Sequence, residues 1–308
     1  MIIDAHCYLS RELPPAELLR VMDEGGVNRT VLFAEAFEPP PAEVPTRLLL
    51  SALGPICRAR YNRLVEKRDP CPEAGPSDWC GTADRPDNEG VAEAVAAHPD
   101  RFIGFVFVNP ADPQHPDIME LYLESGFKGV KVHPWLHGFN VERELFLAAK
   151  RCGELGVPVL LHLGGSRPTG LSVIDLADRL PATSFILAHA GLPYYSALWR
   201  AARLRPNIYF DLSGPYMSAE LLRVVASNVP PGRLLFASGG PHGLRLPEGG
   251  HSYSAVRSWI EALPLPGAAL EAILGGNLRR ILSLDDDAWR REEVRARLVG
   301  ASGTPGDR

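Results

Sequence analysis

Apolar residues recur in two alternating patterns along most of the 308-residue chain. Short runs rich in β-branched and aromatic residues predict eight strands, at residues 2–5, 30–33, 102–108, 129–132, 158–162, 184–188, 208–211 and 234–237. Amphipathic segments with helical spacing separate these runs, among them residues 16–24, 91–97, 116–125, 142–155, 172–180, 196–204, 218–227 and 254–262. Eight strands that are each followed by a helix are typical of a (β/α)8 TIM barrel, and we predict this α/β fold. A doubly wound sheet is the alternative, although no G-x-G-x-x-G follows the first strand.

One stretch breaks this alternation. Residues 38–88 are far longer than an ordinary connection between a strand and a helix, and they are rich in proline, arginine and cysteine. This insertion leaves from the C-terminal end of strand 2, so we expect it to cover the barrel mouth as a lid, with a solvated helix as the alternative. The prediction is therefore one barrel domain over residues 1–284, which contains the insert, followed by a charged tail at 285–308.

Composition narrows the function classes. A net charge of −5 offers no basic surface for nucleic acid or an anionic membrane, and no run of 18 apolar residues predicts a transmembrane span. The first residues enter a strand without the features of a signal peptide, and the five cysteines are scattered. We therefore expect a cytoplasmic protein that acts on a small molecule. Whether it is a monomer or a homo-oligomer stays open.

The N-terminal sequence Asp4-Ala5-His6-Cys7-Tyr8 is almost a metal-binding motif. Side chains alternate along a strand, so Asp4, His6 and Tyr8 are expected on one face and Cys7 on the other. A His-x-His pair here would direct two imidazoles at one metal ion, but tyrosine occupies the second position. Any account of function must explain this tyrosine.

Four histidines fall at the C-terminal ends of predicted strands: His6, His133, His162 and His189. A barrel brings these ends together around one axis, so we predict that the four imidazoles share a site. Lys131 lies on the same strand face as His133 and should also point inward.

These motifs resemble those of the amidohydrolase superfamily, in the branch that contains aromatic-acid decarboxylases and metal-dependent hydrolases. The resemblance runs in order over about residues 1 to 284, and its main pieces are DAH at 4–6, GFKGVKVHP at 126–134, PVLLH at 158–162, ILAHAG at 186–191, NIYFDLSG at 207–214 and LFAS at 235–238. It implies a TIM barrel with a mononuclear zinc site. That site takes two histidines from strand 1, one from strand 5 and an aspartate from strand 8, and a strand 6 histidine serves as acid or base.

Carried over to this chain, the resemblance assigns His6 and His162 as metal ligands. It assigns His189 as the catalytic acid or base, or as a third ligand. Tyr8 and Gly239 stand where the family has its second histidine and its aspartate, so the metal site is degenerate. Zinc is a candidate cofactor, with no cofactor as the alternative. Restoring both side chains, by Tyr8→His with Gly239→Asp, is predicted to rebuild the ligand set.

Other side chains are candidates to replace the missing groups. His133 and Asp211 are candidate catalytic residues; Asp211 is either a replacement carboxylate or a cap for backbone N–H groups. Arg167, Tyr8 and Lys131 are candidate substrate-binding residues, because an arginine can hold a carboxylate through paired N–H donors. Carbamylation of Lys131 to a bridging ligand is a further alternative.

The glycines that follow strand 8 also have two interpretations. Backbone N–H groups at residues 238–240 could cradle an anion, or the segment could be a simple turn.

Three functions stay open. The first is an amidohydrolase-like enzyme that hydrolyses, or non-oxidatively decarboxylates, a small carboxylated and hence anionic substrate with an altered metal centre. The second is a metal-free enzyme. The third is a barrel that has lost catalysis and binds a ligand or a partner. The three imidazoles of His6, His162 and His189 favour an enzyme, because a scaffold does not need them to converge.

Overall fold

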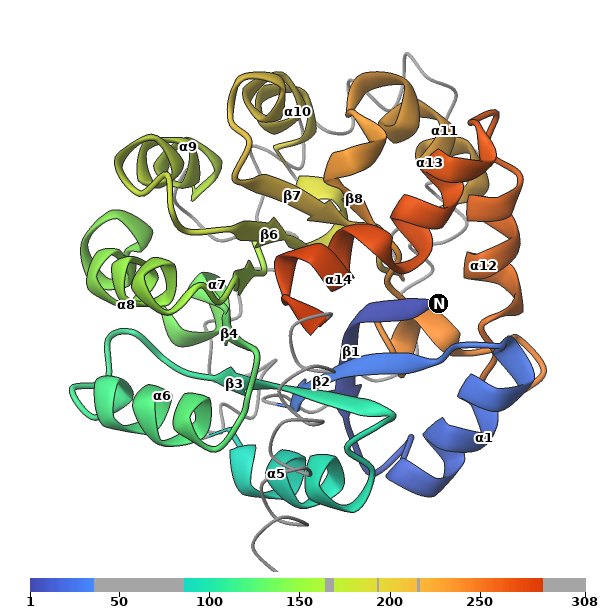
Figure 1. Ribbon diagram of the computed structural model, residues 1–308, viewed down its shortest axis with the longest axis horizontal. Coiled ribbons are helices and arrows are strands. Elements are labelled where there is room, and N and C mark those ends of the chain that lie inside the picture. The colour runs from blue at the N-terminus through green and yellow to red at the C-terminus, as the bar shows by residue number, and fades with distance from the viewer. Residues whose placement is uncertain (36–85, 164–168, 193, 215–216, 285–308) are drawn as a thin grey trace, which may run out of the picture.

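The computed structural model describes residues 1–35, 86–163, 169–192, 194–214 and 217–284. Eight parallel strands form one sheet in sequence order, which confirms the (β/α)8 barrel (Figure 1). The strands are β1 (Ile3–Leu9), β2 (Arg29–Ala34), β3 (Phe102–Phe107), β4 (Gly129–Val132), β5 (Val159–Leu161), β6 (Phe185–Leu187), β7 (Ile208–Asp211) and β8 (Leu234–Leu235).

Helices surround the strands in the described part of the chain (Figure 1). They are α1 (Pro15–Gly25), α5 (Asn88–Ala97), α6 (His115–Glu124), α7 (Pro134–His137), α8 (Val141–Leu155), α9 (Thr169–Arg179), α10 (Tyr195–Leu204), α11 (Ala219–Asn228), α12 (Ser254–Glu261), α13 (Gly267–Glu271) and α14 (Asn277–Ile281). Short helical turns are η1 (Ala188–Gly191), η2 (Pro231–Arg233), η3 (His242–Leu244) and η4 (Ala272–Gly276). No helix among these residues is long and apolar enough to cross a membrane.

The barrel closes between β1 and the segment after β8. The Ala5 N–H donates to the Phe236 carbonyl at 3.0 Å, and the Gly239 N–H donates to the His6 carbonyl at 2.8 Å. Strand β8 is shorter than predicted because the Phe236 N–H donates to the Ile273 carbonyl of η4 rather than continuing a ladder. Closure therefore joins β1 to the segment that follows β8, and the contact lies beside His6.

Strand β1 contains a β-bulge that changes the expected alternation. Asp4 pairs with Thr30 and Cys7 pairs with Leu32, so three steps on β1 oppose two on β2. Paired residues point to the same face of a sheet, so Asp4 and Cys7 lie on one face, away from Tyr8, which pairs with Phe33. The prediction that Asp4 shares a face with His6 and Tyr8 is therefore wrong, because the extra residue of the bulge turns it outward.

Asp4 instead links the point of barrel closure, at Ser238, to Tyr253 at the start of α12. Its carboxylate accepts the Tyr253 hydroxyl at 2.7 Å and the Ser238 hydroxyl at 2.6 Å, and it also accepts the Ser238 and His6 backbone N–H groups. Burial raises the pKa of Asp4 to about 6, against these hydrogen bonds, which lower it. Asp4 is thus a structural residue.

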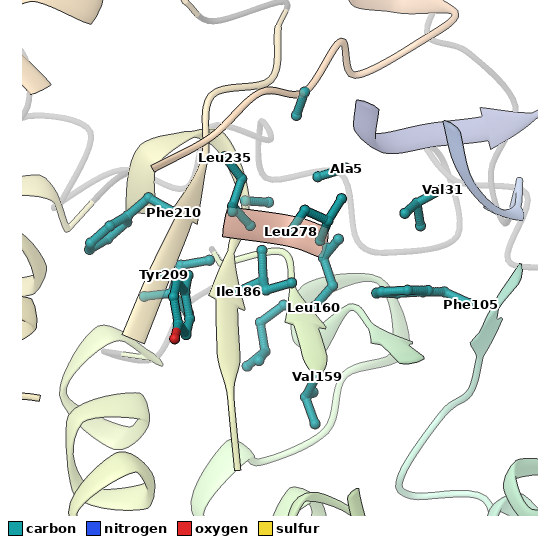
Figure 2. Packing of buried hydrophobic residues seen from close by; sticks show 14 of the residues in the cluster. Ala5, Val31, Phe105, Val159, Leu160, Ile186, Tyr209, Phe210, Leu235 and Leu278 are labelled. Atoms are coloured by element: carbon teal, nitrogen blue, oxygen red, sulfur yellow. The ribbon is translucent and has the colours of Figure 1, made fainter. Parts of the chain in front are cut away.

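Helix α14 plugs the end of the barrel opposite the strand C-termini. It lies across the barrel beside the N-terminus (Figure 1), and Leu278 packs with Leu160, Ile186 and Leu235 in the centre (Figure 2). These side chains are buried. With this end filled, the carboxyl ends of the strands remain as the place for a site.

The insert (38–88) and the tail (285–308) lie almost wholly outside the described residues. The structure describes the insert only from residue 86, and helix α5 begins within it at Asn88. The lid, the tail and the domain limits therefore stay predictions.

Leu278→Ala should lower the free energy of unfolding by about 2–5 kcal/mol, because it opens a cavity in the apolar plug. Leu204→Ala, at the end of α10, is the matched control: Leu278 is 1% exposed and Leu204 is 82% exposed. Urea titrations of both variants and the parent measure the difference. Equal stability of the two variants would contradict the role of α14.

Candidate active site

Four histidine rings form a continuous row at the carboxyl ends of the strands. The His133 and His162 rings stack with centroids 4.1 Å apart. The His162 and His189 centroids lie 4.7 Å apart, and those of His189 and His6 lie 5.3 Å apart. His162 is partly exposed, whereas the other three are buried. The structure thus brings together the four histidines that the sequence placed at strand ends, in a row that runs from the rim inward.

Asp211, the last residue of β7, anchors this row. One carboxylate oxygen lies 2.8 Å from His6 Nδ1. The other accepts the backbone N–H groups of His189 at 3.0 Å and Ser213 at 3.1 Å, together with the Ser213 hydroxyl. Burial alone would raise the pKa of Asp211, but His6, His189 and Ser213 hold it well below its usual value. The sequence offered two interpretations of Asp211, a replacement carboxylate and a cap for backbone N–H groups. In the structure it caps backbone N–H groups and also places a carboxylate in the site.

The carboxylate sets the protonation of His6. Ionised Asp211 can only accept, so we assign the proton to His6 Nδ1 and a lone pair to Nε2. That Nε2 atom is buried and has no hydrogen-bond partner in the described part of the chain. Burial lowers the pKa of His6 to about 4, although Asp211 opposes the shift. His6 is therefore a neutral imidazole with a free basic nitrogen.

His189 sits on strained backbone. Its φ is 53° and that of Ala190 is 56°, the left-handed region that side chains other than glycine rarely occupy. The bond from the His189 N–H to Asp211 and a 2.9 Å bond from Trp199 Nε1 to the Ala190 carbonyl hold this turn. Strain of this kind is typical of functional sites, where surrounding contacts maintain it.

Ser213 orients the His189 ring. Because the Ser213 hydroxyl donates to Asp211, it accepts from His189 Nδ1 at 2.9 Å. This assigns the lone pair of His189 to Nε2, which then accepts from His162 Nδ1 at 3.3 Å. Burial lowers the pKa of His189, so this ring too is neutral at pH 7. Two basic nitrogens, from His6 and His189, therefore belong to one site.

Lys131 points inward as predicted. Its Nζ atom lies 4.9 Å from the Phe33 ring centroid and 5.7 Å from that of Tyr8. The atom is buried and has no hydrogen-bond partner among the described residues. Burial lowers the pKa of Lys131 to about 7, with Asp211 acting in the opposite direction. The Lys131 charge in turn helps to lower the pKa values of all four histidines.

His133 is positioned by a short helix. Its Nδ1 accepts the Leu136 N–H at 3.2 Å, which caps α7 and places the proton of the neutral ring on Nε2. Burial lowers the pKa of His133 well below its ordinary value. Its stacked ring therefore supports His162 rather than facing His6.

Tyr8 belongs to an aromatic wall of the site. Its ring meets the Phe33 ring edge-on at 4.6 Å and the His6 ring at 5.4 Å. Sequence reasoning missed Phe33, which reads as an ordinary core residue of β2. It also missed Ser213, whose spacing two residues after Asp211 was the available signal. Arg167 lies outside the described residues.

The segment after β8 has no free cradle for an anion. The N–H groups of Ser238, Gly239 and Gly240 donate to Asp4, to the His6 carbonyl and to the Ser238 hydroxyl, respectively. Because these donors are engaged within the protein, the turn interpretation is supported and the anion interpretation is wrong.

Gly239 cannot become the missing aspartate. Its φ is +67°, and a Cβ there would lie 2.3 Å from the Gly214 carbonyl oxygen. The Gly214 N–H bonds the Ser238 carbonyl at 3.0 Å, which holds the two backbones together. The prediction that Tyr8→His with Gly239→Asp rebuilds a metal site is therefore not supported, since backbone fills the space that the carboxylate needs.

As they are arranged, the described side chains do not form a complete ligand set for a catalytic zinc. Such a zinc takes three protein ligands, and no three His, Cys, Asp or Glu side chains among the described residues are grouped to hold a metal. His162 and His189 bond to each other, while His6 Nε2 is unpartnered. The chemistry available to these residues is that of neutral imidazoles and an amine.

The model of the amidohydrolase family matches residues 3–284. A similar protein of established function is the 2-keto-4-carboxy-3-hexenedioate hydratase of Sphingobium sp. strain SYK-6. It is 24% identical over an alignment of 243 residues, and the match covers 63% of this chain and 69% of the relative.

Solved structures share the fold. The 4-oxalomesaconate hydratase of Rhodopseudomonas palustris superposes with a TM-score of 0.61 at 18% identity, covering 96% of this chain and all of that chain (100%). A dihydroxybenzoic acid decarboxylase from Polaromonas sp. JS666, with bound manganese and 2-nitroresorcinol, gives a TM-score of 0.57 at 18% identity, covering 92% of this chain and 97% of that one. At these identities the likeness concerns the fold.

Gly239→Ala should destabilise the protein more than Gly138→Ala. Both glycines have φ near +66°, but a Cβ at Gly138 meets nothing within 4 Å. Gly138→Ala should cost about 1–2 kcal/mol for the left-handed backbone, and the clash at Gly239 should add about 1–3 kcal/mol. Chemical denaturation measures both. Equal losses would show that the Gly214 backbone yields without cost.

Asp211→Asn should lower the free energy of unfolding at pH 7 by about 2–3 kcal/mol, because hydrogen bonds to a charged acceptor are lost. The folded pKa of Asp211 is depressed, so its contribution is present above its ordinary value of 3.8 and is lost as the pH falls below it. The difference between parent and variant should therefore shrink in acid. Asp175→Asn, in an exposed ion pair on α9, is the control and should change little. A pH-independent difference would contradict the assigned charge.

Proposed function

The chain belongs to the amidohydrolase family, and on that premise we propose that it is an enzyme that hydrolyses or non-oxidatively decarboxylates a small carboxylated substrate. The observation that carries the proposal is His6: Asp211 fixes its Nδ1 proton, and its buried Nε2 lone pair has no partner among the described residues. The relatives named above act on, or bind, small acids or phenols. An anionic substrate is therefore the best supported class.

His6 Nε2 is the proposed general base, with Asp211 as its positioning residue. In hydrolysis it would take a proton from the attacking water. In decarboxylation it would first take up a proton from solvent and then deliver it to the substrate carbon that loses carbon dioxide. Asp211 stabilises the imidazolium that forms, because its carboxylate is already ionised and bonded to Nδ1. His6 and Asp211 are already in contact, so neither side chain needs to move for these roles.

His189 and His162 form the proposed second proton path. The hydrogen bond between His162 Nδ1 and His189 Nε2 links the partly exposed ring to the buried one. A proton can thus move between the rim and the interior of the site. His133 supports this path by stacking on His162.

We propose that Lys131 and Arg167 bind the substrate carboxylate. Lys131 is the buried basic group of the described site, and a substrate carboxylate would give Nζ an acceptor. Arg167 follows β5 and would hold a carboxylate from outside the described residues.

Zinc is the cofactor that the resemblance implies, and His6 and His162 would be its ligands. His189 would become a third ligand only by giving up its bond to His162. The proposed chemistry of the described residues therefore runs through imidazole groups.

The alternative of a catalytically lost barrel is not favoured. A binding scaffold gains nothing from a left-handed His189 or from an unsatisfied buried nitrogen on His6, and each costs free energy.

His6→Gln should lower kcat/KM by about 100- to 10,000-fold, the usual contribution of a general base. The parent is assayed with 4-oxalomesaconate, 2-keto-4-carboxy-3-hexenedioate and dihydroxybenzoate, with carbon dioxide release and product mass as readouts. His98→Gln, at the end of α5 and away from the site, is the matched control.

Circular dichroism is the check that the His6→Gln variant is folded. The proposal is wrong if the folded His6→Gln variant turns over a substrate as fast as the parent. Absence of turnover by the parent on a wider panel of small carboxylates would favour the binding-protein alternative.

A further inference from the structure

We propose that Lys131 is a nucleophile that forms a Schiff base with the carbonyl group of a 2-oxo carboxylate. The inference rests on the proposed function for the class of substrate, which it narrows to acids that carry a carbonyl beside the carboxylate. It goes beyond that function by assigning covalent chemistry to a group that the proposed function uses only to bind the substrate carboxylate.

The surroundings of Nζ are those of an amine rather than of an ion-paired ammonium. The side chain is fully buried, and Nζ has no hydrogen-bond partner among the described residues. The Phe33 and Tyr8 rings face it. The Asp211 carboxylate is committed to His6, His189 and Ser213. A buried ammonium without a partner is costly, so the neutral form is favoured, in keeping with the pKa near 7.

The barrel fixes the direction of the side chain. Gly129 lies two residues before Lys131 on the same face of β4, and the Phe105 ring fills the space where its side chain would be, 2.5 Å from an ideal Cβ. The Phe105 ring therefore fills the space below the aliphatic part of the Lys131 side chain, on the side of the apolar core. Nζ is directed to the carboxyl ends of the strands, where the histidine row lies.

The choice of lysine is itself informative. Only four of the 32 basic residues of this chain are lysines: Lys67, Lys128, Lys131 and Lys150. Arginine supplies positive charge nearly everywhere else, and its guanidinium would serve a purely electrostatic role. Arginine remains protonated and cannot attack a carbonyl, whereas lysine can. A buried lysine in an arginine-rich chain thus points to chemistry that requires an amine.

His6 is placed to move the protons of this reaction. The His6 ring centroid and Lys131 Nζ each lie 4.9 Å from the centroid of the same Phe33 ring. His6 Nε2 has a free lone pair, since Nδ1 is held by Asp211. The amine and the base therefore both lie against the Phe33 ring.

The steps balance without a further reagent. Nζ attacks the carbonyl carbon and forms a C–N bond, and His6 Nε2 takes a proton from nitrogen and passes it to the oxygen, which gives a neutral carbinolamine. A second proton, taken up from solvent, lets that oxygen leave as water, and an iminium forms. When a carboxylate is β to this carbon, its C–C bond breaks, carbon dioxide leaves, and the electron pair moves into the iminium to give an enamine. Protonation at carbon and addition of water release the product and regenerate the amine.

The test is reductive trapping on the full chain. The protein is incubated with pyruvate, the simplest 2-oxo carboxylate, and sodium cyanoborohydride, which reduces an iminium to a stable secondary amine. Peptide mass spectrometry then locates the adduct among the four lysines. We expect it predominantly on Lys131, close to one per chain, and dependent on both reagents.

Variants sharpen the result. Lys131→Met removes the amine but keeps an unbranched apolar side chain, so it should fold and give no buried adduct. Lys150→Met, at an exposed position on α8, should trap as the parent does. If Lys131→Met does not fold, the position of the adduct in the parent still shows whether Lys131 forms the Schiff base.

The outcomes separate the two proposals. Trapping confined to Lys67, Lys128 or Lys150, or no trapping at all, overturns the Schiff base. If Lys131→Met turns over a substrate as the parent does, the Schiff base and the substrate-binding role of Lys131 are both overturned, while general-base catalysis by His6 stands. An adduct on Lys131 in a protein that turns over none of the carboxylates tested supports the amine chemistry and overturns the proposed hydrolysis or decarboxylation.

Discussion

The carboxylate of Asp211 is the interaction on which the site depends. It lies at the end of β7 and bonds groups from β1, from η1 and from the segment that follows β7. Through these bonds it fixes the tautomer of His6, holds His189 in the left-handed region and, through Ser213, orients the His189 ring. A buried carboxylate without these donors would be costly, so the donors and the acceptor stabilise one another.

On the β8 side of the same site, closely packed backbone occupies the space of a side chain. Where the family resemblance implies a strand 8 aspartate, Gly239 packs against Gly214, and the Gly243 N–H bonds the Gly239 carbonyl at 2.9 Å. The chain thus differs from the family pattern by more than two side chains. Close approach of backbone leaves no room for a carboxylate at this position, whereas Asp211 supplies one from the neighbouring strand.

Electrostatics follow from this arrangement. Three imidazoles and one amine are buried, and the fourth imidazole, that of His162, is partly exposed. Desolvation lowers each of their pKa values, and a proton on Lys131 would lower those of the histidines further. The result is a set of neutral bases beside one ionised carboxylate. A site of this kind can abstract protons at neutral pH, and its lysine can act as an amine.

The sequence by itself determined the barrel, because its eight strand–helix repeats are local patterns of apolar residues, and it determined which histidines converge, because parallel strands end at one face. It also indicated that Lys131 points inward, from the period of two along β4. It could not determine the outward turn of Asp4, which depends on an extra residue in the pairing of β1 with β2. The partners of Asp211, the tautomers of His6 and His189 and the closure around Gly239 were decided only by the tertiary structure, because each is a contact between residues far apart in the chain. Whether a side chain is paired, and hence whether its nitrogen is free, depends on all of its neighbours at once, and no local pattern contains that information.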